Sequence, residues 1–220
     1  MPSSVKPLIF LGAGGHAKVL LAMARLLQFE VTGVCCPLLS GDRERTWNGI
    51  AVLGGDEQLE RLNPETCLLV NAVGFMPGNQ LRHQLFCNAK SKGFNFASLI
   101  HPYAFVDSNS FLGEGCQVMA GAVIQVNASI ADNSIVNSNA TIEHDCSIGL
   151  SNHIAPGATL CGEVVTGSQV FIGANATLIQ QVIVKSGAVI AAGALVLRDV
   201  EAGSVHGRKS GRSGGHNETK

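Results

Sequence analysis

Every sixth residue from Ile100 to Val196 is aliphatic, with a single exception at Thr166. An α-helix repeats its apolar face every 3.6 residues, and an amphipathic strand alternates with a period of two. Neither element can use a period of six that persists for nearly a hundred residues. The spacing therefore predicts a β-solenoid in which each hexad forms one short strand and its turn.

A second column of residues supports the same register. Small residues stand four positions after most of the aliphatic ones, at Ser110, Cys116, Ala122, Ala128, Ser134, Ala140, Cys146, Asn152, Ala158, Ala176, Ala188 and Ala194. Small side chains suit the tight corners of a triangular coil, and three hexads per coil predict five to six coils stacked on a continuous apolar column.

Two irregularities in the hexads carry predictions of their own. Glycine follows the column at Gly113, Gly149, Gly167 and Gly173, which predicts a turn backbone that other residues resist. Thr166 takes an aliphatic position, which predicts a local bulge before the phase resumes at Ile172.

The bulk composition excludes several classes of protein. The formal net charge of −1 gives no sign of a basic face for nucleic acid. The sequence contains no run of eighteen apolar residues, so we expect no membrane span. Met1–Pro7 lacks the apolar run of a signal peptide. Only 14% of residues are charged, which suggests that oligomerisation hides apolar surface.

The number and spacing of the cysteines predict a protein of a reducing compartment. Their number, seven, is odd, and no C-x-x-C pair occurs. We therefore expect small buried thiols in a reducing cytoplasm, with neither disulfides nor a metal site.

The first hundred residues predict a small α/β domain. An apolar strand at 8–11 leads into Gly12, Gly14, Gly15 and His16, followed by a helix at 17–29 and a strand at 31–35. This is the opening βαβ unit of a Rossmann-like fold, and its turn places helix N-terminal N–H groups where an anion can sit. Further pieces are expected as an extended segment at 49–53, helices at 57–62 and 79–92, and strands at 67–73 and 94–99.

The glycine turn fits a dinucleotide site only in part. The third glycine of that pattern is missing, and no acidic residue follows the second strand at Cys35–Cys36. A redox enzyme using NAD is therefore disfavoured, and a nucleotide-linked substrate whose phosphates meet Gly12, Gly14 and Gly15 is favoured. His16 is either a phosphate contact or a polar residue at an exposed helix start.

The chain as a whole resembles the NeuD/PglD-type sugar O- and N-acetyltransferases. The resemblance rests on the turn at 12–16 ahead of hexapeptide repeats, on the segment 142–149 (IEHDCSIG), and on the segment 152–158 (NHIAPGA). It implies a left-handed parallel β-helix, an acetyl-CoA donor, and a homotrimer with active sites between neighbouring β-helices. The expected domains are a Rossmann-like sugar-nucleotide-binding domain at 1–99, an acyltransferase β-helix at 100–206, and a disordered tail at 207–220.

His144 is the candidate general base. It stands two places after Ile142, so its side chain should point outward, where a near-neutral imidazole can take a proton from an amine or hydroxyl. A carboxylate can orient the ring, and both Glu143 and Asp145 are available. The resemblance favours Asp145, although sequence neighbours on a strand point to opposite faces.

The donor site is expected along a wall of small residues. The resemblance places His153 near the thioester carbonyl, and a surface histidine is the competing interpretation. Gly173, Ala174 and Ala192 offer a smooth wall for the pantetheine arm, and tight packing of coils explains them equally well.

These observations predict acetyl transfer from acetyl-CoA to the amine of a nucleotide-activated 4-amino-deoxy sugar, with UDP as the expected nucleotide and no metal. O-acetylation of a sugar hydroxyl, such as that of sialic acid, uses the same base and donor and stays an alternative. A non-catalytic solenoid scaffold is the lower alternative. Two features depart from the family pattern: Cys35-Cys36-Pro37 replaces acidic residues, and Arg208-Lys209 stands near the end in place of a Gly-x-Pro-Ala-like segment.

Overall fold

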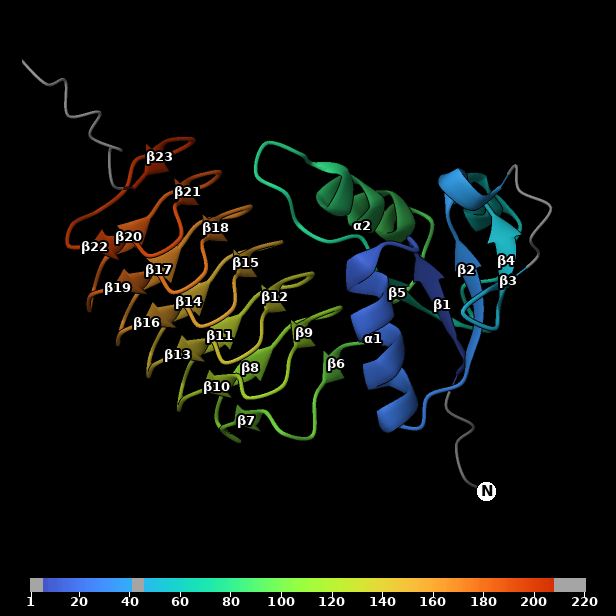
Figure 1. Ribbon diagram of the computed structural model, residues 1–220, viewed down its shortest axis with the longest axis horizontal. Coiled ribbons are helices and arrows are strands. Elements are labelled where there is room, and N and C mark those ends of the chain that lie inside the picture. Colours follow the sequence, from blue (N-terminus) through green and yellow to red (C-terminus); the bar gives the residue numbers. More distant parts are fainter. Residues whose placement is uncertain (1–5, 41–45, 208–220) are drawn as a thin grey trace, which may run out of the picture.

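The computed structural model describes residues 6–40 and 46–207, and the tail at 208–220 lies outside the described residues. An N-terminal α/β domain packs against one side of a β-helix, whose strands stack away from it (Figure 1). Among the described residues, no helix is long and apolar enough to cross a membrane.

The N-terminal domain is built around one five-stranded sheet. Its elements are β1 (Leu8–Leu11), α1 (Gly15–Leu26), β2 (Val31–Cys35), the 3₁₀-helix η1 (Pro37–Leu39), β3 (Thr46–Trp47), β4 (Ile50–Gly54), the 3₁₀-helix η2 (Asp56–Glu60), β5 (Leu68–Asn71) and α2 (Leu81–Ser91). The strand order is β3-β4-β2-β1-β5, with β3 antiparallel to β4 and the other pairs parallel. The order confirms the Rossmann-like fold.

The central strand β1 is buried along its whole length because apolar clusters cover both faces of the sheet. Leu8 and Phe10 belong to the cluster that includes Leu20 of α1, and Ile9 belongs to the cluster that includes Phe86 of α2. Parallel strands covered on both faces read as continuous apolar runs, and β1 does.

Two predicted elements of this domain differ from the structure. The segment predicted as a helix at 57–62 is the shorter 3₁₀-helix η2. The strand predicted at 94–99 is reduced to one isolated bridge between Leu69 and Phe96. Its last residue, Leu99, instead begins the first strand of the β-helix.

The β-helix contains eighteen strands of two residues each. They are β6 (Leu99–Ile100), β7 (Phe105–Val106), β8 (Phe111–Leu112), β9 (Gln117–Val118), β10 (Val123–Ile124), β11 (Ser129–Ile130), β12 (Ile135–Val136), β13 (Thr141–Ile142), β14 (Ser147–Ile148), β15 (His153–Ile154), β16 (Thr159–Leu160), β17 (Val165–Thr166), β18 (Phe171–Ile172), β19 (Thr177–Leu178), β20 (Ile183–Val184), β21 (Val189–Ile190), β22 (Leu195–Val196) and β23 (Val205–His206).

These strands form three parallel sheets, one on each side of a triangular, left-handed coil. The sheets are β7-β10-β13-β16-β19-β22, β8-β11-β14-β17-β20 and β6-β9-β12-β15-β18-β21-β23. Most paired residues are eighteen apart in sequence, as in the pair of Ile124 with Ile142. The aliphatic column and the small-residue column together fill the interior, which confirms the register predicted from the sequence.

The turns correct the prediction made for the glycines. The left-handed backbone falls three residues after the aliphatic column, for example at Asn133 (φ 58°), Asp145 (φ 59°) and Gly157 (φ 69°). Gly113 and Gly149 are needed for a different reason, since a Cβ at Gly149 would lie 2.3 Å from the carbonyl oxygen of Gly167 on the next coil. These glycines allow close stacking and do not supply the turn.

The prediction of a bulge at Thr166 is also wrong. Thr166 is buried in the column, and the pairing of Thr166 with Val184 keeps the register. Its Oγ1 accepts hydrogen bonds from Asn152 Nδ2 at 2.6 Å and from the Gly149 N–H at 3.1 Å. A buried polar pair thus replaces an apolar one without shifting the strand, because each group finds its partner inside.

The two domains are joined by apolar packing and by one buried arginine. Leu99, Met119 and Ile135 of the β-helix share an apolar cluster with α1. The Arg82 guanidinium, also buried, donates to the Asn71 and Val73 carbonyls at 2.7 Å and to that of Asn133 at 3.1 Å. Burial lowers the pKa of Arg82 to about 9.

Candidate active site

His144 and Asp145 lie together at an exposed corner of the β-helix, after β13. His144 Nδ1 is 2.8 Å from Asp145 Oδ2. The left-handed turn at Asp145 (φ 59°) breaks the strand alternation that would have separated the two side chains. A carboxylate only accepts hydrogen bonds, so Nδ1 carries the proton and Nε2 keeps a free lone pair.

The electrostatics of this pair suit a general base. The hydrogen bond to Asp145 raises the pKa of His144, and the charge of Asp145 acts in the same direction. The same bond, followed by one from Asn127, lowers the pKa of Asp145. About half of each side chain is exposed, which leaves the imidazole accessible to a substrate.

The neighbouring coils hold this pair in place. Asn127, one coil before Asp145, donates from Nδ2 to Asp145 Oδ1 at 3.1 Å. Gly162, one coil after His144, leaves the space that the ring occupies, and a Cβ there would lie 2.5 Å from His144 Cε1. Sequence reasoning missed both residues, although adding or subtracting the coil length of eighteen would have found them.

Gly12, Gly14 and Gly15 border a cavity at the carboxyl ends of the parallel strands. Gly12 has φ 104°, and a Cβ there would lie 2.9 Å from the side chain of Val73. Gly14 and Gly15 are exposed at the N-terminus of α1, with open space where a side chain would be. The free N–H groups of this helix end can bind an anion. The cavity has a volume of about 590 Å³.

His16 turns toward the β-helix as well as lining this cavity. Its Nε2 is 2.7 Å from Gln117 Oε1, and Gln117 Nε2 in turn donates to the Asn71 carbonyl at 2.8 Å. Burial lowers the pKa of His16 to about 4, so the ring is neutral near pH 7. Gln117 Oε1 takes the single N–H of this neutral ring, so in the structure His16 offers a phosphate neither a charge nor a free N–H.

His153 lies under the loop that follows β5. Its ring packs edge-on against Phe75 at 5.9 Å and against Phe171 at 5.2 Å, between ring centroids. Asn137 Nδ2 lies 3.1 Å from His153 Nε2, and Nδ1 has no hydrogen-bond partner among the described residues. Burial lowers the pKa of His153 to about 3, so this ring is a neutral group and no base.

The proposed wall of small residues runs along the corner that follows β15, β18 and β21. Gly173 is buried, and a Cβ there would lie 2.4 Å from the Ala192 nitrogen, so it serves the stacking of coils. Ala174 is half-buried and Ala192 is exposed, so these two present their methyl groups to the surface.

The structure does not bring the wall and the His144–Asp145 pair together within one chain. His144 follows β13, whereas Ala174 precedes β19 and Ala192 precedes β22. These three strands belong to one sheet. His144 therefore lies at the corner where the strands of this sheet end, and the wall lies at the corner where they begin, so one side of the triangular coil separates them.

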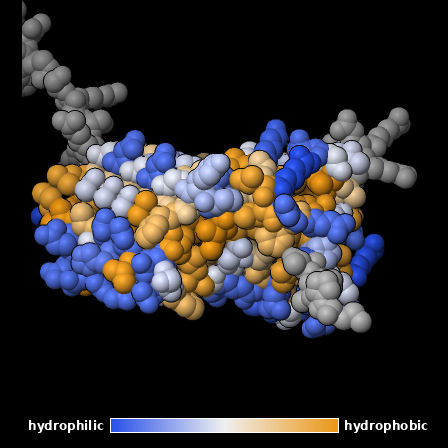
Figure 2. Space-filling view, turned by 90° about the horizontal axis from the view of Figure 1, so that it is seen from below, coloured by the Kyte–Doolittle hydropathy of each residue, from blue (hydrophilic) through white to orange (hydrophobic). Residues whose placement is uncertain are grey.

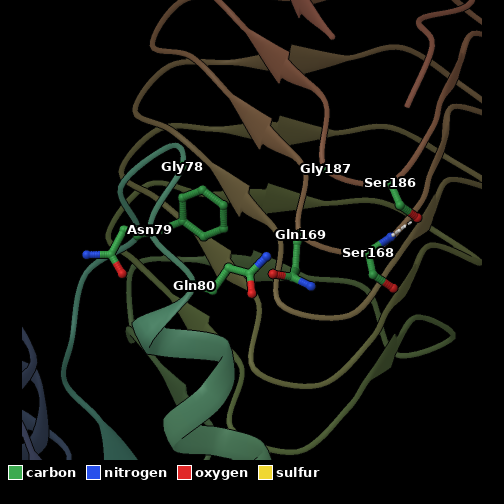
Figure 3. Close-up of a pocket in the computed structure, with 8 residues that line it drawn as sticks. Gly78, Asn79, Gln80, Ser168, Gln169, Ser186 and Gly187 are labelled. Atoms are coloured by element: carbon green, nitrogen blue, oxygen red, sulfur yellow. Dashed lines mark hydrogen bonds between the residues drawn. The ribbon is translucent and has the colours of Figure 1, made fainter. Parts of the chain in front are cut away.

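A second cavity, of about 290 Å³, opens on the other side of the loop at 75–80 (Figure 3). It is lined by Phe75, Gly78, Asn79, Gln80, Ser168, Gln169, Ser186 and Gly187. None of these side chains ionises near pH 7, so this cavity offers no acid–base chemistry. No cluster of three potential metal ligands occurs among the described residues.

Comparisons with known proteins find relatives for both the N-terminal domain and the β-helix. Residues 7–89 match the family described as the PglD N-terminal domain. The acetyltransferase domain of PglB from Neisseria gonorrhoeae is 36% identical, with 91% of this chain and 95% of that chain covered and a TM-score of 0.82. PerB from Caulobacter crescentus, solved with CoA and GDP-perosamine, is 32% identical, with 92% and 94% covered and a TM-score of 0.81.

A third structure, the PglB domain in complex with acetyl coenzyme A, is 35% identical over 92% of this chain and 96% of that chain, with a TM-score of 0.83. A search of curated proteins finds no match. With more than 30% identity over nearly the full length of both chains, the chain belongs to the NeuD/PglD-type family of hexapeptide-repeat sugar acetyltransferases.

Proposed function

We propose that the protein transfers the acetyl group of acetyl-CoA to the amine of a nucleotide-activated 4-amino-deoxy sugar. The observation that carries this proposal is the His144–Asp145 pair, a hydrogen-bonded and accessible base on a family β-helix. The phosphate-ready cavity at Gly12–Gly15 supports an acceptor that carries a diphosphate.

His144 acts as the general base in this reaction. Its Nε2 accepts a proton from the sugar amine while the nitrogen forms a bond to the acetyl carbon. Asp145 stabilises the imidazolium that results. The C–S bond then breaks, and the proton passes from His144 to the leaving sulfur, which gives free CoA and the acetamido sugar.

Two nucleotides are candidates for the diphosphate that binds at the N-terminus of α1. The family resemblance favours UDP, whereas the related PerB is solved with GDP-perosamine, which brings GDP into consideration. The diphosphate of either nucleotide can bind at the N-terminus of α1, because the backbone N–H groups there bind the phosphates and do not contact the base.

We further propose a homotrimer in which each active site lies between two copies. The separation of His144 from Ala174 and Ala192 supports this, since one copy would supply the base and its neighbour the donor wall. Exposed apolar side chains near the domain junction, Val19, Leu26, Tyr103 and Phe105, give a surface to bury. Figure 2 shows apolar surface across the middle of the face seen from below.

We propose that the reaction takes place in the cytoplasm. All seven cysteines are free thiols in the structure, which agrees with a reducing compartment.

The test is release of free thiol from acetyl-CoA with UDP-, GDP- and dTDP-linked 4-amino sugars and with sialic acid. We expect release with one nucleotide amino sugar and a loss of roughly 10²–10⁴-fold in His144→Ala. His83→Gln is the control, because His83 contacts Ser151 at a different corner of the β-helix. Release only with sialic acid would establish O-acetylation instead, and no release with any acceptor would overturn the proposal.

A further inference from the structure

Asp56 stands at the edge of the cavity bordered by Gly12, Gly14 and Gly15, and it follows β4, whereas a dinucleotide site has its acid after β2. It follows Gly54 at the carboxyl end of β4 and opens η2. The Cys36 N–H donates to the Gly54 carbonyl at 2.7 Å, so the ends of β2 and β4 lie side by side. Asp56 lines the same cavity as the loop at Gly12–Gly15.

The carboxylate of Asp56 has no hydrogen-bond partner within 6–40 and 46–207, the part of the chain that the structure describes. It is the only carboxylate among the described residues that line the cavity, and no described residue donates a hydrogen bond to it. Burial, and secondly the charge of Glu57, raises the pKa of Asp56. Glu57 itself turns away and accepts a bond from the Gly55 N–H at 2.9 Å. A half-desolvated acceptor of this kind favours a ligand that brings N–H donors.

The geometry of the cavity fixes which part of the nucleotide meets Asp56. The diphosphate belongs at Gly14 and Gly15, at the N-terminus of α1. The sugar must extend toward Phe75, because that end of the cavity adjoins the β-helix. The base therefore lies at the opposite end, against the side chains of Cys36, Pro37, Leu38 and Asp56.

We propose that Asp56 selects guanine, so that the acceptor is a GDP-linked sugar; this rests on the proposed transfer to a nucleotide sugar. Guanine presents its N1–H and N2–H₂ side by side, and a carboxylate can accept from both at once. Uracil and thymine place carbonyl oxygens on both sides of their single N–H, and those oxygens repel a carboxylate. Adenine and cytosine place a ring acceptor beside their amino group. The apolar surface of Pro37 and Leu38 gives the purine ring a face to pack on.

The test is isothermal titration calorimetry of the full chain with GDP, UDP, ADP and inosine diphosphate, without acetyl-CoA. Inosine diphosphate differs from GDP only in lacking the 2-amino group. We expect GDP to bind most tightly, and each lost bond to the carboxylate to weaken binding roughly ten- to hundredfold.

Variants of Asp56 and of its neighbour Glu57 test which of the two carboxylates causes the preference for GDP. In Asp56→Ala, GDP and inosine diphosphate should bind equally, close to the affinity of UDP. Glu57→Gln should keep the wild-type order, because Glu57 turns away from the base.

Each other outcome is decisive. Tightest binding of UDP or ADP by the wild type would overturn the selection of guanine and leave the proposed transfer standing. Equal weakening of all four nucleotides in Asp56→Ala would also overturn it, because the carboxylate would then contact the ribose. If no nucleotide binds to the wild type, the selection of guanine and the proposed acceptor both fall.

Discussion

The imidazole of His144 lies over Gly162 of the next coil, in space that any side chain would fill. A Cβ at Gly162 would stand 2.5 Å from His144 Cε1 and 2.6 Å from Nε2. Gly162→Ala should therefore turn the ring away from Asp145 and lower kcat/KM roughly 10²-fold, since displacements of about 1 Å have such effects. The melting temperature should change little, because the ring is exposed and can move. Wild-type activity in Gly162→Ala would show that this ring position is not the reactive one.

Asp145 should set the pH at which kcat/KM rises, through its effect on the pKa of His144. The base works unprotonated, so kcat/KM rises as the pH rises through the pKa of His144. The hydrogen bond to Asp145 raises that pKa. Asp145→Asn should therefore move the rise to lower pH and also lower the plateau, roughly 10²-fold or more.

Glu143→Gln is the matched control for this effect. The charge of Glu143 raises the pKa of His144 less than Asp145 does, so its removal should give a smaller shift in the same direction. A pH–rate profile of Asp145→Asn with an unchanged midpoint would refute the assignment.

Much of the β-helix could be predicted because its period is imposed by stacking. Every sixth residue belongs to the aliphatic column, and each of them is the second residue of a strand. The positions of the strands from β6 to β22 can therefore be predicted from the sequence. The glycines were misread because two different constraints both favour glycine. One is the left-handed backbone at positions such as Gly157, and the other is the approach of the next coil at positions such as Gly149.

These two kinds of glycine should respond differently to substitution. Gly149→Ala should destabilise the fold by about 1–3 kcal/mol, since the new Cβ meets the Gly167 carbonyl and cannot be accommodated without movement. Gly193→Asn should be close to neutral, because its φ of 67° matches that of Asn133 and nothing lies within 4 Å. Chemical denaturation measures both, and equal losses would contradict the distinction.

The buried pair of Thr166 and Asn152 gives a separate test of the interior. Thr166→Val removes the acceptor for one N–H of Asn152 Nδ2 and for the Gly149 N–H, while Asn152 Nδ2 keeps its second bond, to the Gly167 carbonyl at 2.9 Å. The free energy of unfolding should fall by about 1–3 kcal/mol. Thr159→Val, one place earlier in its hexad and partly exposed, should change it by less than about 0.5 kcal/mol. A higher free energy of unfolding in Thr166→Val than in the wild type would show that the buried hydroxyl destabilises the fold.

The site was predictable where it depends on local sequence and not where it depends on long-range contacts. His144 and Asp145 are neighbours, and the corner that joins them is short. The bond from His16 to Gln117 spans 101 positions, and no local pattern announces it. Asp56 could not be predicted from the dinucleotide pattern, because that pattern places the acidic residue after β2, whereas Asp56 follows β4. UDP, expected from the resemblance, stays a prediction, and the position of Asp56 favours GDP.

Complementation between inactive variants tests most directly whether His144 and the donor wall of a neighbouring copy form one active site. His144→Ala removes the base, and Ala192→Trp blocks the wall, so neither protein alone should release thiol from acetyl-CoA. Unfolded and refolded together in equal amounts, they should regain about a quarter of wild-type activity, because a randomly mixed ring pairs an intact base with an intact neighbouring wall at that frequency. Persistent inactivity of verified mixed oligomers would contradict the account and place the base and the wall within a single copy.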